Sequence, residues 1–203
     1  MHKGRTEAFS DGVLAIIITI MVLQLDVPEG RELSDLFRDW PKMLAYVVSF
    51  LYVGLYWNNH HHMFQAVKRI NGVVLWGNLH LLFWLSLLPW LTAWVGESHF
   101  APTPISVYAF DLLMCAVAFP LLQRALIRAD ASNTLLAQAV RGSTKEKVSM
   151  LAYVVAVVLP LLGQTAAYMA GILLMVVGLS WAVPDPRIER VLAESGDSAS
   201  PPS

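Results

Sequence analysis

Hydrophobic residues along the chain gather into six long segments, separated by shorter polar stretches. The segments cover about residues 9–25, 41–64, 73–95, 105–127, 148–162 and 166–183. A helix needs about 20 mainly apolar residues to cross a hydrocarbon core about 30 Å thick, and about 17 are enough when its polar end lies at the interface. The pattern predicts an all-α membrane protein with six transmembrane helices in one domain, residues 1–183. The Pro/Ser-rich residues 184–203 are expected to form a disordered tail.

Basic residues are distributed unevenly between the two ends of these predicted helices. With six spans, both termini lie on one side, and eleven basic residues then share that side: Lys3, Arg5, Lys68, Arg69, Arg124, Arg128, Arg141, Lys145, Lys147, Arg187 and Arg190. The other side has three, Arg31, Arg38 and Lys42. Because cytoplasmic loops carry the excess of Lys and Arg, we expect a multi-pass protein of the cell membrane with both termini, and therefore the tail, in the cytoplasm.

Composition supports a membrane protein and excludes several other classes. Of the 203 residues, 56% are hydrophobic and 14% charged, against about 25% charged in soluble domains. A net charge of −1 gives no sign of nucleic-acid binding. The single cysteine, Cys115, excludes a disulfide framework and a zinc-binding spacing. No nucleophile elbow, zinc-protease motif or P-loop is present, so we expect no enzyme activity and no cofactor.

The first hydrophobic segment has two chemically different faces. At 100° per residue, Gly12, Ile16, Ile20 and Leu23 form one apolar stripe, and Thr19 borders it. The Asp11 side chain projects about 140° away from Ile16 and is expected to face neighbouring helices. A stripe of this kind is most often a lipid contact or part of a bundle core, and its periodicity alone does not distinguish these from a pore wall.

Polar residues of the first three segments share one depth in the membrane. They are Arg5, Ser10 and Asp11 in the first, His60, His61 and His62 in the second, and Asn78 and His80 in the third. The simplest interpretation is a hydrogen-bonded network that locks the three helices together, because unpaired polar groups are costly there. A proton relay is an alternative. A metal site is disfavoured, since three consecutive histidines project about 100° apart.

Two observations in the rest of the chain narrow the possibilities. Asp111 lies near the start of the fourth segment, where we expect it to be interfacial. No TVGYG-type selectivity filter is present. If the protein is a channel, its selectivity does not come from rings of backbone carbonyls.

The sequence Arg5-x-x-x-Phe9-Ser10-Asp11 resembles the R-x-x-x-F-S-D signature of the transmembrane-protein-175 potassium channels. That family serves endosomes and lysosomes in animals and has smaller prokaryotic homologues. Trp57-x-x-His60 is similar to its W-x-x-H motif, and Asn78 with Pro89 to its third-helix pattern. These motifs cover residues 5–95, and the resemblance beyond them is in span count only.

The resemblance implies a homotetramer of the prokaryotic type, in a lipid bilayer, conducting monovalent cations and modestly selective for K⁺ over Na⁺. The first helix would line the pore, with Ile16 as the constriction, Ile20 and Leu23 as further apolar layers, and Thr19 as a hydroxyl ring that contributes with Ile16 to selectivity. The residues that match the polar network holding this helix are Arg5, Ser10, Asp11, Trp57, His60 and Asn78.

Two other functions remain open on the sequence. A proton-conducting channel or proton-coupled transporter could use Asp11 and the histidines of the second segment, although no convincing internal repeat is visible. A non-conducting membrane protein, such as a sensor or assembly partner, is the other alternative. Reversal potentials that follow pH rather than K⁺ would favour the proton hypothesis, and electrically silent purified protein would favour the last.

Overall fold

The computed structural model describes residues 3–130 and 144–182. The predicted tail, residues 184–203, and most of the basic stretch 129–147 lie outside these ranges. The described residues contain helices and no strand, which confirms the all-α fold class. The helices are α1 (Lys3–Val22), α2 (Leu33–Leu36), α3 (Trp40–Gln65), α4 (Gly72–Glu97), α5 (Pro102–Ala129), α7 (Thr144–Val158), the 3₁₀ helix η1 (Leu159–Leu162) and α8 (Gln164–Ala182).

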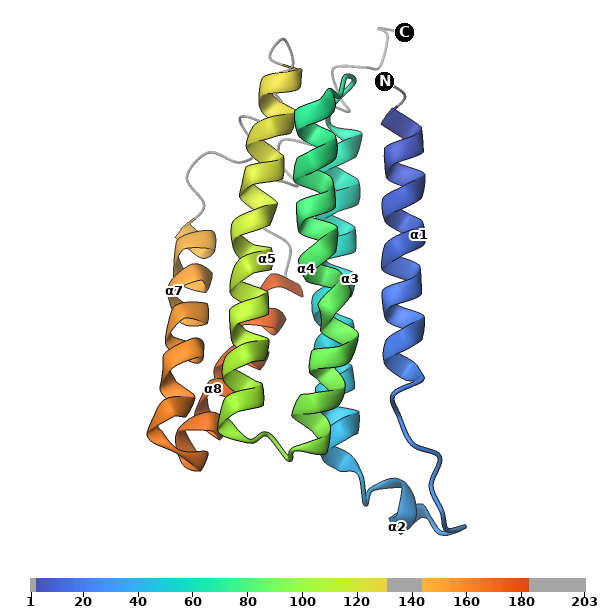
Figure 1. Ribbon diagram of the computed structural model, residues 1–203, viewed down its shortest axis with the longest axis vertical. Coiled ribbons are helices and arrows are strands. Elements are labelled where there is room, and N and C mark those ends of the chain that lie inside the picture. The colour runs from blue at the N-terminus through green and yellow to red at the C-terminus, as the bar shows by residue number, and fades with distance from the viewer. Residues whose placement is uncertain (1–2, 131–143, 183–203) are drawn as a thin grey trace, which may run out of the picture.

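The long helices run roughly along one direction and form a bundle (Figure 1). Helix α1 packs against α3 and α4, whereas α7, η1 and α8 pack against α5. The start of α1, the α3–α4 connection and the end of α5 lie at one end of the bundle, and the short α2 lies at the other (Figure 1). The core is densest between α4 and α5, where leucines are almost completely buried: Leu81, Leu85, Leu88, Leu112 and Leu122.

Local sequence signals explain where several helices begin. The side chain of Asn71 accepts a hydrogen bond of 3.1 Å from the Val74 N–H and caps α4. Pro41 and Pro102 lie in the first turns of α3 and α5, where a missing N–H costs nothing. Gly163 connects η1 to α8 with a φ of 118°, which a residue without Cβ adopts readily.

Among the described helices, α4, α5 and α8 are long and apolar enough to cross a membrane by length and composition alone. The other candidates depart from this standard for visible reasons. Helix α1 carries Arg5, Glu7 and Asp11 in its first half, and α3 carries three histidines near its end. Helix α7 has only 15 residues before the 3₁₀ turn begins. Pro160, which lacks an N–H, lies in that turn.

The first helix also differs in extent from the expected segment. It begins at Lys3 instead of Phe9, so the polar residues are part of the helix, and it ends at Val22 instead of Leu25. Beyond Val22 the N–H groups of Leu23, Gln24 and Leu25 bond to carbonyls three residues back, each over 3.2 Å. The helix therefore tightens into a 3₁₀-like turn at this end.

Candidate functional site

Helix α1 has one face packed into the bundle and one that no other described part of the chain covers. The packed face comprises Thr6, Ser10, Leu14, Ile17 and Met21. On the opposite side, the Ile16 side chain is 58% exposed and the Ile20 side chain 42% exposed. The apolar stripe predicted from the sequence is therefore the free face of the helix, and the bundle core is formed by a different set of residues.

The residues that flank this free face have different surroundings. Thr19 is exposed, and its hydroxyl donates a hydrogen bond of 2.9 Å to the Ile16 carbonyl oxygen. A hydroxyl that donates its hydrogen to its own helix still has two lone pairs on its oxygen that can accept. Leu23 is 80% exposed and lies one residue past the end of α1, in the turn described above.

A shallow, mostly apolar groove of about 330 Å³ lies between the free face of α1 and helix α4. Ile16 and Ile20 contribute one wall, and Pro89 and Trp90 contribute the other. Pro89 lies inside α4 and removes a backbone donor there. The free face of α1 is therefore continuous with a shallow, mostly apolar depression beside α4.

On the packed side of α1, three buried side chains from three helices form one chain of hydrogen bonds. The Asn78 amide N–H donates to Ser10 Oγ over 2.9 Å, and the Asn78 Oδ1 lies 2.8 Å from His60 Nε2. The Ser10 hydroxyl also lies 2.9 Å from the Thr6 carbonyl oxygen. This places Ser10, His60 and Asn78 together and ties α1 to α3 and α4 inside the bundle.

A second polar contact joins α1 to α3 on the exposed side. The Trp57 indole N–H donates to Asp11 Oδ1 over 3.0 Å. The Trp57 ring also stacks on His61 at 5.8 Å between centroids, and His61 Nε2 lies 2.8 Å from Gln65 Nε2. Asp11 and Trp57 therefore form a pair separate from the buried network.

Arg5, the sixth residue expected in the network, is not brought into it. Its side chain is exposed, and within the described ranges it has no hydrogen bond or ion pair. His60 is buried, whereas His62 is exposed, as the 100° spacing predicts. Within residues 3–130 and 144–182, no three His, Cys, Asp or Glu side chains converge on one point.

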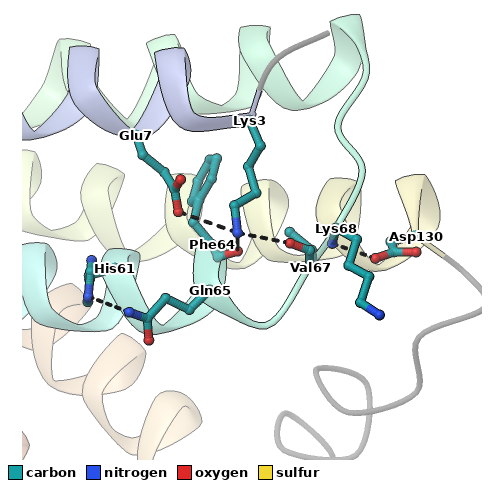
Figure 2. A network of polar contacts seen from close by, with 8 residues as sticks. All are labelled: Lys3, Glu7, His61, Phe64, Gln65, Val67, Lys68 and Asp130. Atoms are coloured by element: carbon teal, nitrogen blue, oxygen red, sulfur yellow. Dashed lines mark hydrogen bonds and ion pairs between the residues drawn. The ribbon is translucent and has the colours of Figure 1, made fainter.

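The end of the bundle near Lys3 holds a contact that the sequence reasoning missed (Figure 2). Lys3 Nζ donates to the carbonyl oxygens of Phe64 and Val67 at 3.0 and 3.1 Å, and it lies 3.6 Å from Glu7 Oε1. In the same region the Lys68 N–H donates to Asp130 Oδ2 over 2.7 Å. A lysine at a helix C-terminus satisfies carbonyls that have no intrahelical partner. The spacing of Lys3 and Glu7 was the available signal, but the acceptors are backbone atoms far away in sequence.

These features together define a class: an all-helical membrane protein whose first helix is anchored by buried polar contacts and leaves an apolar, hydroxyl-bearing face free. A sequence profile described as "Endosomal/lysosomal potassium channel TMEM175" matches residues 5–89. A protein of Chryseobacterium sp. (strain P1-3) named as a potassium channel is 50% identical over 96% of this chain and 100% of its own length. The chain belongs to the TMEM175 family, and the family consists of ion channels, not enzymes.

Two further relatives place the chain within that family. The structure is similar to the crystal structure of a lysosomal potassium-selective channel TMEM175 homolog from Chamaesiphon minutus, with a TM-score of 0.75 and 29% sequence identity. The match covers 89% of this chain and 96% of the Chamaesiphon chain. The mouse protein named "Endosomal/lysosomal proton channel TMEM175" is 32% identical over 59% of this chain but only 26% of its own length. The bacterial relatives therefore match in size, whereas the animal protein is much longer.

Proposed function

We propose that this chain assembles as a homotetramer and forms a potassium-selective cation channel whose pore is lined by α1. The single observation that carries the proposal is the free apolar face of α1, with Ile16 at 58% exposure, on a helix held from behind by the Ser10–Asn78–His60 contacts. A helix anchored on one side only, in a family of channels, offers its other side to a symmetry axis. Arg5 and the α1–α4 groove are then available for contacts between copies.

The proposal includes six membrane crossings by α1, α3, α4, α5, the α7–η1 unit and α8. The distribution of charge supports this topology. The start of α1 and the α3–α4 connection lie at one end of the bundle (Figure 1), and they contain Lys3, Arg5, Lys68 and Arg69. The segment around α2 and the start of α3 lie at the other end, and they contain Arg31, Arg38 and Lys42. By the positive-inside rule the α1 start is cytoplasmic, in the cell membrane.

Four copies of Ile16 around the axis would form a hydrophobic constriction. In its narrow state this ring excludes water, and an ion cannot pass because it would have to lose its hydration into hydrocarbon. A small rotation or outward shift of the four α1 helices would let water in. Ile20 and Leu23 add further apolar layers toward the acidic residues 26–40, which attract cations to the outer mouth.

Preference for K⁺ over Na⁺ would follow from the same geometry. K⁺ gives up part of its hydration at lower cost than Na⁺, so a narrow apolar ring favours it. The lone pairs of Thr19, whose proton is bound to the Ile16 carbonyl, supply oxygen ligands next to that ring. We therefore assign Thr19 and Ile16 as the residues that set selectivity, with permeant K⁺ as the only small-molecule ligand.

Proton conduction is the second candidate function. The observation that favours it is the exposed row formed by Asp11, Trp57, His61 and Gln65, together with the naming of the mouse relative as a proton channel. Such a row offers titratable groups along α3 outside the buried network. A channel that conducts protons would use Asp11 and the α3 histidines in place of the Ile16 ring.

One experiment separates these functions. Purified protein is reconstituted in liposomes, and fluxes of K⁺, Na⁺, Cs⁺ and H⁺ are compared under matched gradients. The proposal predicts a reversal potential that follows the K⁺ gradient, with K⁺ flux above Na⁺ flux. A reversal potential that follows pH supports proton conduction, and no flux of any ion contradicts both.

A further inference from the structure

Asp111 has a carboxyl group buried inside the bundle, on α5 and not on α1. From its position near the start of the fourth hydrophobic segment, Asp111 is expected at the membrane interface. In the structure Asp111 is only 2% exposed, so this expectation is wrong for the folded chain. It lies on α5, nine residues after Pro102, between the buried neighbours Ala109 and Leu112. The helix face that carries Asp111 is turned into protein, because α4, α7 and α8 all pack against α5.

Neither oxygen of the Asp111 carboxyl group has a hydrogen-bond partner among the described residues. The groups within electrostatic reach are neutral: Tyr56 of α3, and Tyr108 and Cys115 of α5. The Tyr108 hydroxyl is already engaged with Ser49 Oγ, at 2.8 Å. Tyr153 of α7 interacts with Cys115 and Tyr56 and belongs to the same cluster.

The charged residues of α7, Lys145, Glu146 and Lys147, lie in its first turn, where Glu146 is close to Arg124 in the second half of α5. Helices α4 and α8 bring no charge to the position of Asp111. Helix α4 has His80, which accepts a hydrogen bond from Trp84, and its next titratable residue, Glu97, is at its far end. Helix α8 has one ionisable side chain, Tyr168, which is exposed. No lysine or arginine among the described residues acts on the Asp111 carboxyl group.

An ionised carboxylate in this position would have neither a counter-charge nor a hydrogen-bond donor, which is among the most unfavourable arrangements in a membrane bundle. A metal ion would not remedy this, because the described residues contain no group of three potential ligands. A proton neutralises the group and needs no additional space. The neutral acid is therefore the form compatible with this packing.

We propose that Asp111 is a proton-binding site separate from the α1 face, which carries its proton in the packed bundle and releases it only when the packing around α5 opens. The folded protein then holds one proton that the opened protein gives up at neutral pH. Packing of α5 against its neighbours consequently weakens as pH rises. This inference concerns the helix bundle and does not depend on which ion the protein conducts.

Infrared spectroscopy of the full-length protein, labelled at aspartate with ¹³C, tests the proposal directly. We expect a neutral carboxylic-acid band that persists at about pH 6, where exposed carboxyl groups are ionised, and that is lost in Asp111→Asn. Absence of such a band in the wild-type protein overturns the proposal, and this measurement requires no variant to fold. If Asp111→Asn does not fold, Asp111→Leu serves for the assignment.

Thermal unfolding in detergent between about pH 5 and pH 7 provides the second measurement. We expect the wild-type melting temperature to fall as pH rises, and at least half of that fall to disappear in Asp111→Asn, which cannot ionise. Glu97→Gln is the matched control, because Glu97 is an exposed carboxylate at a helix end, and it should retain the wild-type slope. Equal slopes in the wild type and Asp111→Asn overturn the proposal.

Discussion

The indole nitrogen of Trp57 lies 3.0 Å from Asp11 Oδ1, and this hydrogen bond links α3 to α1 beside the free face of α1. Asp11 directly follows Ser10, and Ser10 belongs to the buried network with Asn78. Two consecutive residues of α1 are thus bound to two different helices. The orientation of α1, and with it the direction in which Ile16 points, is set by this pair of attachments.

Replacing Asp11 by alanine is therefore expected to destabilise the assembly without altering selectivity. The substitution leaves the Trp57 N–H without its acceptor, which costs about 1 kcal/mol, and it frees α1 to rotate. We expect less tetramer by size-exclusion chromatography of detergent-solubilised protein. Asp11→Asn keeps an acceptor oxygen and should retain more tetramer. A well-folded Asp11→Ala tetramer with changed permeation would reverse the assignment of Asp11 as a structural residue.

Replacing Ile16 by asparagine is expected to raise cation flux and reduce discrimination between K⁺ and Na⁺. A polar ring holds water where an apolar ring excludes it, so the barrier at the constriction falls. Ion flux in liposomes is the measurement. Val47→Asn is the matched control, because Val47 is an apolar residue of α3 with the same exposed fraction as Ile16, 58%. The Val47→Asn variant should leave the flux unchanged. Unchanged flux and selectivity in Ile16→Asn would remove Ile16 from the constriction.

Replacing Thr19 by valine preserves the shape of the side chain and removes its oxygen. If the Thr19 oxygens contribute to selectivity, the K⁺ to Na⁺ permeability ratio should fall, while the amount of tetramer stays the same. Thr19→Ser keeps the hydroxyl group and should keep most of the ratio. Bi-ionic reversal potentials measure the effect, and an unaltered ratio in Thr19→Val would assign selectivity to the apolar ring alone.

Replacing Asn78 by leucine is expected to lower the stability of the bundle. Ser10 loses its amide donor and His60 loses its partner at 2.8 Å, and leaving buried polar groups unpaired costs about 1–3 kcal/mol each. Thermal unfolding in detergent reports the change. Asn59→Leu is the control, because among the described residues the Asn59 side chain bonds to the Leu55 carbonyl of its own helix and to no other helix. Equal losses in the two variants would contradict a special role for the Asn78 network.

Replacing Lys3 by methionine is expected to loosen the start of α1 from the end of α3. Two carbonyl acceptors lose a charged donor, and because the site is partly exposed we expect a loss of about 1 kcal/mol. Faster hydrogen exchange in residues 3–10 and 62–68 is the measurement. Arg5→Ala is the control for the single chain, since Arg5 has no partner among the described residues. If Arg5 contacts a neighbouring copy, that variant should lower tetramer content and leave this exchange unchanged.

Much of this protein was predictable from its sequence. Segment hydropathy predicted the all-α class, and the Arg5-x-x-x-Phe9-Ser10-Asp11 motif identified the family, which the relatives confirm. The shared depth of Ser10, His60 and Asn78 was also readable, because depth follows from the position of a residue along its helix. The cytoplasmic position of the termini and the assignment of Ile16, Thr19, Ile20 and Leu23 to the pore remain predictions.

Other features could not be read from the order of residues. The sequence determined which residues lie at one level and which faces of α1 are apolar, because a helix has a fixed period. Only the tertiary structure decided that Asp11 pairs with Trp57 apart from the buried network, that Lys3 binds the end of α3, and that Asp111 is enclosed. These outcomes depend on how the helices are rotated against one another, and that rotation follows from packing among many side chains at once.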